Sequence, residues 1–298
     1  MLIFNDANWN VSGLFVYDGV VRSFIESLGI LGTKNPIKGV HGAPRVKWNG
    51  GRVSRTPANI STVQILTTVL NDIDVSVFMT FSNHLLGKDD IKDPFCNQML
   101  DVLEYAENGV IVSSEMLATH IRTHHPNLKQ IASVVKTTIE KGTGNVDYYK
   151  RLLDNYDRVV IHPDDNLNLE LLDKLDKSRC EILVNENCLI NCSTRGQHYD
   201  ILARASMQSE MMIDFKFQEE CGHFHSEVCK SYPLRKRLLQ PNIRNCNLTH
   251  VEMKTIYDMG FRNFKLQGRN ESQASFSFDL NWYILKPEMM PIVFKAMA

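Results

Sequence analysis

The sequence predicts an α/β protein built as a closed (β/α)8 barrel of the TIM type. Short apolar runs alternate with longer segments of helical periodicity along the 298 residues, which is the pattern of a parallel sheet with helical crossovers. Most of these runs are continuously apolar, as expected for strands that are covered on both faces. Eight of them can be counted, enough to close a barrel; an open doubly wound sheet is the alternative. We treat residues 1–298 as a single barrel domain.

The expected strands, in chain order, are residues 2–4, 37–42, 75–81, 109–113, 130–135, 158–162, 181–185 and 263–267. The expected helices are residues 18–29, 56–72, 93–109, 114–125, 147–156, 168–178 and 249–260. Asp18 is placed to cap the first helix, and Thr56 precedes Pro57 at the first turn of the second. Residues 186–260 break this rhythm and are expected to form an insertion at the C-terminal ends of the strands, where barrel enzymes place their chemistry.

The composition indicates an ordinary globular protein, with 43% hydrophobic residues, 22% charged residues and a formal net charge of −1. The first residues lack the basic start and apolar core of a signal peptide, and no apolar run reaches the roughly 20 residues that span a bilayer. We therefore expect a cytoplasmic protein with no membrane association. Its seven cysteines are then expected to be reduced, which favours metal binding or catalysis over disulfides.

Cys188 and Cys192 form the most informative motif, because two thiolates at this spacing can chelate one iron or zinc centre. Ser193 or Thr194 would cap the following helix, whose positive N-terminal end favours thiolates. Further thiols follow at Cys221, Cys229 and Cys246. Zinc could also recruit His223 or His225, so the spacing leaves the metal open. Cys96 and Cys180 are expected to be buried apolar residues.

Polar residues end several apolar runs, as a pocket at the barrel mouth requires. The candidates are His41, Asn83, His84, His162, Asp164 and Lys265. Arg195 and His198 lie one helical turn apart and are expected to share a face near the cysteine pair. Helix capping and ordinary strand-to-loop transitions are the alternative explanation for each. The sequence contains no P-loop, G-x-G-x-x-G, H-E-x-x-H or G-x-S-x-G motif.

A basic segment lies between Glu26 and Asp72, which contains no acidic residue. It includes Arg45, Lys47, Arg52 and Arg55, interleaved with Trp48 and two glycines. Such a run is typical of a solvated basic loop, but this mixture also fits a rim that binds phosphate, and hence nucleic acid or another phosphate-bearing substrate.

Three segments resemble the collagenase-like peptidase family, formerly the unassigned peptidase family thirty-two. "GFRNFKLQGRNES" is similar to the K-(I/L)-x-G-R segment near the end of that family. "NENCLINCSTRGQHY" is similar to its Asn-x-x-Cys-x-x-x-Cys-x-x-Arg-x-x-His signature. "IRNCNLTHVEMKTIYDMGF" resembles the segment before the final strand, although the family usually has Pro-Glu where Asn245 and Cys246 stand. The resemblance covers roughly residues 75–270.

The resemblance implies a TIM-like barrel with a [4Fe–4S] cluster held by the insertion at residues 186–260. Cys188, Cys192 and Cys229 would be ligands, with Cys221 or Cys246 as the fourth. Members of the family include factors that hydroxylate RNA bases or ubiquinone precursors without O2, so such an activity is expected here. Arg195, Lys265 and Arg269 would hold an anionic substrate or donor at the barrel mouth.

The other candidate residues are assigned to catalysis or to substrate binding. His198 and His162 join the catalytic candidates. His41 and Asn83 join Arg45, Lys47, Arg52 and Arg55 as substrate-binding candidates. Peptide hydrolysis and a non-catalytic, metal-stapled interaction protein are the alternative functions, and an oligomer or paired subunit is compatible with each.

Overall fold

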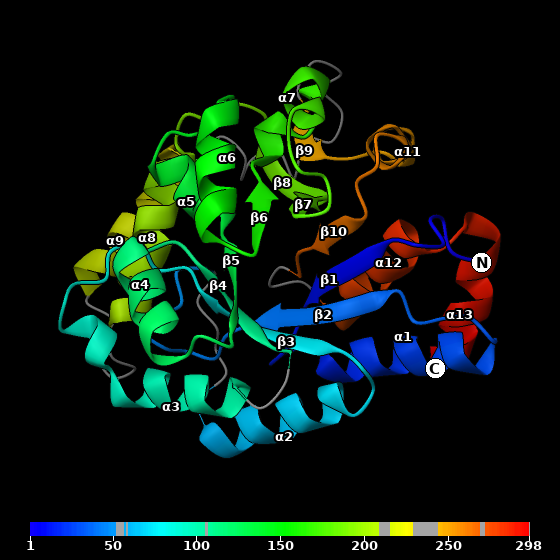
Figure 1. Cartoon of the computed structure of the whole chain (residues 1–298), viewed down its shortest axis with the longest axis horizontal. Helices are drawn as coiled ribbons and strands as arrows, with labels where there is room; N and C mark the ends of the chain where they lie inside the picture. Colours follow the sequence, from blue (N-terminus) through cyan, green and yellow to red (C-terminus); the bar gives the residue numbers. More distant parts are fainter. Residues whose placement is uncertain are drawn as a thin grey trace.

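The chain forms a closed barrel of eight parallel strands, as the sequence predicts (Figure 1). The structure is a computed structural model that describes residues 1–51, 57, 59–104, 107–208, 215–228, 244–268 and 272–297. Around the barrel the strand order is β1-β10-β7-β6-β5-β4-β3-β2. Each strand pairs in parallel with both neighbours, so all the C-terminal strand ends meet at one end of the barrel, which we call the mouth.

The barrel strands are β1 Asn8–Ser12, β2 Ile37–Gly42, β3 Ser76–Phe81, β4 Gly109–Val112, β5 Lys129–Ala132, β6 Arg158–Ile161, β7 Cys180–Leu183 and β10 Asn263–Leu266. Seven of them overlap the predicted runs. The prediction for residues 2–4 is wrong, because Leu2 forms only an isolated bridge with Leu285. The first strand is β1 instead, and the polar Asn8 and Asn10 interrupt its apolar pattern.

Helices surround the barrel: α1 Asp18–Ile30, α2 Ile60–Asn71, α3 Pro94–Leu103, α4 Glu115–His124, α5 Val134–Ile139, α6 Val146–Asn155, α7 Leu169–Asp173, α11 His250–Asp258, α12 Gln273–Ile284 and α13 Met290–Met297. Three 3-10 turns accompany them: η1 Asp90–Lys92, η2 Pro163–Asp165 and η4 Pro287–Met289. Side-chain caps fix several starts. The predicted start of the second helix at residue 56 is wrong, since Asn59 accepts a hydrogen bond from the Ser61 amide and α2 begins at Ile60.

Among the described residues, two hydrophobic clusters make up the core of the barrel, and a third, small cluster joins α8 to α9 and η3. The larger barrel cluster packs the outer faces of the strands against the helices. The smaller barrel cluster fills the barrel interior with Phe78, Ile111, Ile131, Val160 and Leu183. These five side chains come from neighbouring strands β3 to β7, so the opposite side of the interior is left for the polar residues of β1, β2 and β10.

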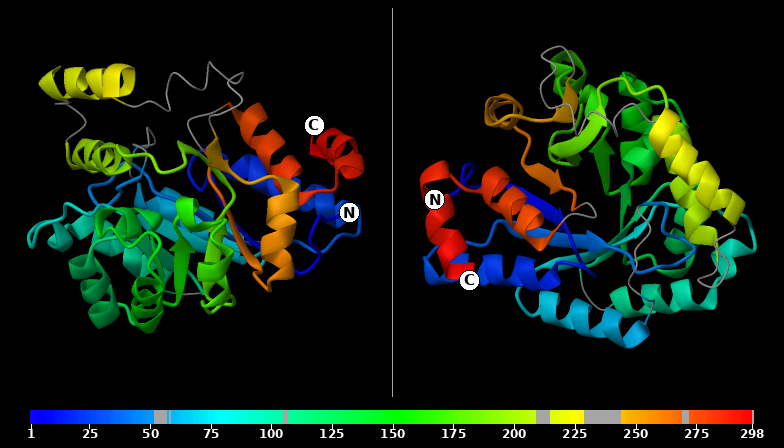
Figure 2. Two further views of the ribbon diagram at one scale, coloured as in Figure 1. Left: turned by 90° about the horizontal axis from the view of Figure 1, so that it is seen from above. Right: turned by 180° about the vertical axis from the view of Figure 1, so that it is seen from behind.

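The described part of the chain between β7 and α11 lies at the mouth. It contains β8 Asn185–Leu189, α8 Arg195–Met207, α9 Phe215–His223, the π-helix η3 Phe224–Val228 and β9 Asn245–Asn247. β8 and β9 form a small antiparallel sheet in which Glu186 lies opposite Cys246. Figure 2 shows α8 and α9 side by side above one end of the barrel.

α8 crosses the mouth between two strand ends. Beyond β3, Asn83 Nδ2 donates to the Ala203 carbonyl of α8 at 3.2 Å. Beyond β6, Asp164 binds Arg195 at the start of α8. Within the described residues, no helix is both long enough and apolar enough to cross a membrane.

Candidate functional site at the barrel mouth

Inward-facing polar side chains form a layer at the mouth. Residues two apart along a strand share a face. In β3, Thr80 therefore points inward like Phe78, one step nearer the mouth. The residues two positions after the apolar interior residues of β4, β6 and β7 also point inward, and they lie just beyond those strands. We call the resulting set the mouth layer: Ser12, Thr80, Ser113, His162, Asn185 and Gln267. The hydroxyl oxygens of Ser12, Thr80 and Ser113 are buried, and none has a hydrogen-bond partner in the part of the chain that the structure describes. Unsatisfied buried hydroxyls are uncommon, and a substrate in the mouth would satisfy them.

Arg195 is the centre of the residues beside this layer. Its side chain is 4% exposed and binds the Asp164 carboxylate through both terminal nitrogens, at 3.0 and 2.9 Å. Nη2 also donates to the Leu189 carbonyl at 2.8 Å. A bidentate pair of this kind is a strong, geometrically specific contact, so it fixes the start of α8 against the end of β6.

Three thiols lie around this guanidinium. The thiols of Cys188 and Cys192 share a hydrogen bond, and the positive charge of Arg195 acts on both. Arg195 Nη2 lies 3.5 Å from Cys246 Sγ, which comes from β9. We call Cys188, Cys192 and Cys246 the thiol cluster. Sequence spacing pairs the first two, and the β8–β9 sheet adds the third.

The thiol cluster is arranged to hold negative charge on Cys192. The hydrogen bond from Cys188 lowers the pKa of Cys192 and raises that of Cys188. Thr194 occupies the N-cap position of α8 but makes no side-chain cap. Its hydroxyl lies 3.4 Å from Cys192 Sγ instead, which stabilises the thiolate further.

His162 is held neutral beside the cluster. Its side chain is buried, with Arg195 Nη1 at 2.8 Å from Nε2 and the Asp164 amide donating to Nδ1 at 3.2 Å. Burial and the adjacent guanidinium lower the pKa of His162 to about 4. Its imidazole therefore carries no charge at neutral pH.

Glu186 connects the thiol cluster to the mouth layer. One carboxylate oxygen accepts from the Cys188 amide at 2.9 Å, and the other accepts from Gln267 Nε2 at 2.9 Å. Glu186 is only 7% exposed and its negative charge raises the pKa of both Cys188 and Cys246. The sequence did not single it out, because one acidic residue within "VNENC" reads as an ordinary loop residue.

Two predicted residues lie away from the cluster. Cys221 packs in α9 against Ile201 and Phe224. The His198 ring also contacts Phe224, with centroids 5.5 Å apart. The structure thus places His198 and Arg195 in different surroundings, and it brings Cys246 rather than Cys221 to the pair. Cys229 lies outside the described residues.

Lys265 lies inside the barrel instead of facing the mouth. Its ammonium is 3.1 Å from Glu181, and Arg158 binds the same carboxylate at 3.2 Å. Burial alone would raise the pKa of Glu181, but these two cations outweigh it and hold that pKa below its usual value. Burial lowers the pKa of Lys265, with Glu181 opposing. Arg269, its predicted companion, lies outside the described residues.

His41 belongs to the same interior network. His41 Nδ1 lies 2.9 Å from Asn10 Oδ1, and Asn10 Nδ2 donates to Glu181. Burial and the charge of Lys265 lower the pKa of His41 far below its usual value. The sequence missed Asn10, Arg158 and Glu181, since only the closed barrel brings their strands together.

The basic segment is more anchored than the sequence suggests. Trp48 is fully buried and its Nε1 donates to the Asp90 carbonyl at 2.7 Å, so its ring anchors the loop. Lys47 pairs with Asp90 at 3.2 Å. Asn83 donates to the Lys47 carbonyl at 2.8 Å and so braces this loop. Arg52 and Arg55 lie outside the described residues.

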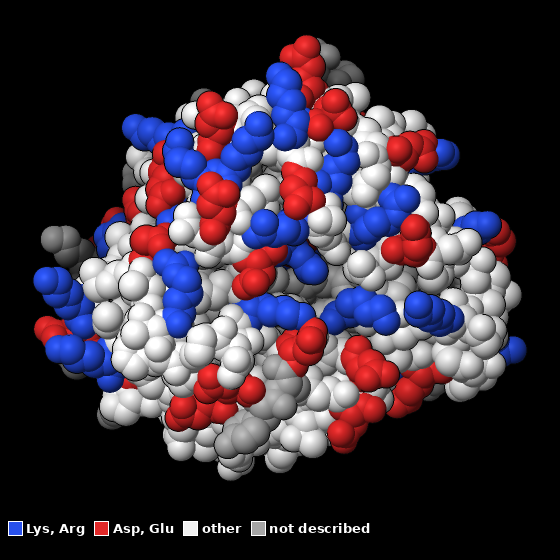
Figure 3. Space-filling model, in the orientation of Figure 1, with Lys and Arg blue, Asp and Glu red and all other residues white. Residues whose placement is uncertain are grey.

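Surface charge is mixed on the opposite end of the barrel. Figure 3 views that end and shows Lys and Arg side chains interspersed with Asp and Glu. Lys129 pairs there with Glu107, and Arg262 with Asp6. This face therefore offers no broad basic surface to a polyanion.

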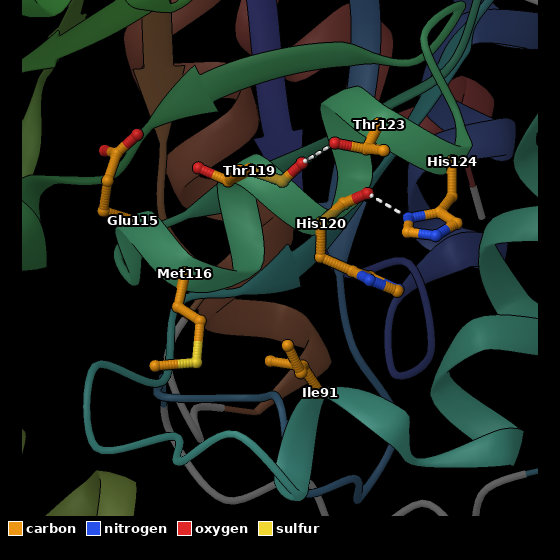
Figure 4. Close-up of a pocket in the computed structure, with 7 residues that line it drawn as sticks. All are labelled: Ile91, Glu115, Met116, Thr119, His120, Thr123 and His124. Carbon is orange, nitrogen blue, oxygen red and sulfur yellow. Dashed lines mark hydrogen bonds between the residues drawn. The ribbon is translucent and has the colours of Figure 1, made fainter.

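A pocket of about 460 Å³ lies on the outer face of α4 (Figure 4). It is lined by Ile91, Glu115, Met116, Thr119, His120, Thr123 and His124. The two imidazoles are tilted by 35° with centroids 4.4 Å apart, and His120 Nε2 lies 2.8 Å from Asn97 Oδ1. α4 covers the outside of the barrel, so this pocket includes neither the mouth layer nor the thiol cluster.

The donor set of the thiol cluster fits a soft metal centre. Three sulfur ligands and a compensating cation are the chemistry that iron–sulfur and zinc sites use. In the part of the chain that the structure describes, however, no three His, Cys, Asp or Glu side chains are already arranged to hold a metal ion. Cys246 donates to Asp164 Oδ1 at 3.4 Å, so ligation requires this thiol to turn toward the other two.

Comparison with known proteins supports the fold. No protein-family model and no curated protein matches the chain. Among solved structures, that of the U32 peptidase Mk0906 is similar, with a TM-score of 0.54 and 12% sequence identity over 89% of this chain and 93% of that chain. At this identity the similarity establishes the shared TIM-like barrel.

Proposed function

We propose that this protein is an enzyme that holds a metal centre on the thiol cluster and binds its substrate in the mouth layer. One observation carries the proposal. Thiols from two separate segments, Cys188 with Cys192 and Cys246 from β9, meet one buried guanidinium at the barrel mouth. In a TIM barrel this end is where chemistry takes place.

A [4Fe–4S] cluster is the preferred metal centre and zinc is the alternative. Cys188, Cys192 and Cys246 would be its ligands, with Cys229 as the fourth candidate. When bound, an iron–sulfur cluster would supply electron transfer that the side chains cannot perform.

The residues around the cluster have defined tasks in this proposal. Arg195 balances the thiolate charge, and Asp164 holds that guanidinium in place. His162 stays neutral, so it adds no positive charge that would compete with the metal centre for the thiolates. The buried hydroxyls of Ser12, Thr80 and Ser113, which have no hydrogen-bond partner among the described residues, would bind polar groups of the substrate.

The reaction that we propose is hydroxylation, without O2, of a nucleobase or a related aromatic ring. The Cys-x-x-x-Cys-x-x-Arg-x-x-His signature from Cys188 to His198 supports it through the family resemblance. The position of Cys192 and Arg195 beside the polar mouth layer is compatible with this reaction.

Peptide hydrolysis is a second candidate, because the structural neighbour is described as a U32 peptidase. A cysteine peptidase needs an imidazole nitrogen directed at its thiol. The ring nitrogens of His162 contact Arg195, Thr138 and the Asp164 amide instead. Peptide cleavage by metal-free protein, lost in Cys192→Ser, would favour this candidate over ours.

Metal analysis of protein purified without oxygen tests the proposal. We expect a visible absorption spectrum and about four irons with matching sulfide per chain, both lost in Cys188→Ser. Cys96→Ser is the matched control, because Cys96 is buried in α3 and should leave the metal in place. Wild-type protein without iron or zinc, or a Cys188→Ser variant that retains its metal, would contradict the proposal.

A further inference from the structure

Arg45 lies in a firmly held loop at the mouth. The loop leaves the C-terminal end of β2, and Trp48 anchors it by edge-on packing against Phe81. Gly50 lies so close to the next strand that a Cβ there would be 2.2 Å from the Ser82 carbonyl oxygen. With the brace from Asn83, these contacts hold the backbone near Arg45 in one position.

The guanidinium of Arg45 has one edge to which no described residue hydrogen-bonds. Its Nε and Nη2 are both buried, and neither makes a hydrogen bond within the described ranges. These two N–H groups point the same way and form the fork that binds a carboxylate or phosphate through two parallel hydrogen bonds. Leaving two charged donors buried and unpaired disfavours the empty protein, so this edge is placed for a ligand.

The groups that surround Arg45 support a ligand as the partner of its guanidinium. Lys47, two residues on, is already paired with Asp90, whereas no ion pair within the described ranges includes Arg45. The same loop reaches the mouth layer, since a Cβ on Gly51 would lie 3.8 Å from Thr80. The Thr80 hydroxyl likewise has no hydrogen-bond partner among the described residues.

We infer that Arg45 binds an oxyanion group of the substrate, a carboxylate or a phosphate, through its Nε–Nη2 edge. The inference rests on the proposed function only in placing the substrate at the mouth. It assigns the substrate a negatively charged end, held at the β2–β3 side. The reacting part of the substrate then extends toward the thiol cluster, beside β6.

Calorimetric titration with inorganic phosphate and with acetate tests this, using the full chain purified without oxygen. We expect at least one anion to bind, and Arg45→Lys to weaken it by about tenfold or more, because lysine keeps the charge but loses the fork. Lys92→Met, which removes an exposed charge from the neighbouring turn η1, should change the affinity by less than about twofold. The anion that binds more tightly identifies the group.

Thermal unfolding provides a second test of the Arg45 site. Without anions, Arg45→Met should melt at or above the temperature of the wild type, since it removes unpaired buried donors. Added anion should raise the melting temperature of the wild type only. Failure of both anions to bind at about 10 mM, or equal binding by Arg45→Lys, would overturn the inference. Because Cys188→Ser should still bind the anion, failure here is distinct from failure of the metal proposal.

Discussion

The buried pair of Arg195 and Asp164 should dominate the stability of the mouth. Replacing Arg195 with methionine keeps much of the side-chain volume but removes both hydrogen bonds to Asp164, at 3.0 and 2.9 Å, and the bond to the Leu189 carbonyl. The Asp164 side chain is only 9% exposed, so its charge would be left uncompensated. Breaking a buried pair from one side costs about 3–5 kcal/mol.

We therefore expect Arg195→Met to lower the free energy of unfolding by about 4 kcal/mol. Urea denaturation of metal-free protein measures this, since bound metal would add its own stabilisation. The double variant Arg195→Met with Asp164→Asn should recover much of the loss, because no buried charge then lacks a partner. A loss below about 1 kcal/mol in the single variant, or no recovery in the double variant, would refute this account of the mouth.

Three further predictions concern pH, the barrel interior and its packing. Burial and Arg195 lower the pKa of His162 from 6.5 to about 4, so the unfolded chain takes up a proton first as pH falls. The stability contributed by neutral His162 is present above pH 6.5 and is lost toward pH 4, by up to about 3 kcal/mol. Urea midpoints across this range should fall less steeply in His162→Gln, and an identical slope would contradict the assignment. Glu181→Gln should destabilise the fold by about 3 kcal/mol or more, because Lys265 and Arg158 lose their shared anion; wild-type stability in urea would contradict this. Gly39→Ala would place a Cβ 2.7 Å from the Phe78 ring and should cost about 1–3 kcal/mol. Gly19→Ala, in open space on α1, should stabilise by up to about 1 kcal/mol, and equal effects in thermal unfolding would refute the contrast.

Most of the barrel could be predicted because parallel strands covered on both faces are continuously apolar. β3 to β7 fill their side of the interior with Phe78, Ile111, Ile131, Val160 and Leu183, so these strands are visible in the sequence as apolar runs. β1 was not predicted, for the opposite reason. Its Asn10 turns inward to Glu181 and His41, and a strand with polar inward residues has no apolar run.

The site was predictable only where it is local in sequence. Cys188, Cys192 and Arg195 lie within eight positions of one another, and the structure keeps them together. Cys246 joins them through the pairing of β9 with β8, a long-range contact that no spacing encodes. Lys265 was expected at the mouth because the sequence does not reveal its partner. That partner, Glu181 on β7, draws Lys265 inward but stands at the edge of an apolar run.

The identity of the third thiol tests the central claim most directly. Metal content per chain should be measured for Cys246→Ser and Cys221→Ser, each purified in parallel without oxygen. Our account predicts that Cys246→Ser loses the metal, because this thiol lies beside Arg195, and that Cys221→Ser retains it, because this thiol packs against Ile201 and Phe224. Full metal content in Cys246→Ser, or loss in Cys221→Ser alone, would contradict the thiol cluster as the metal site.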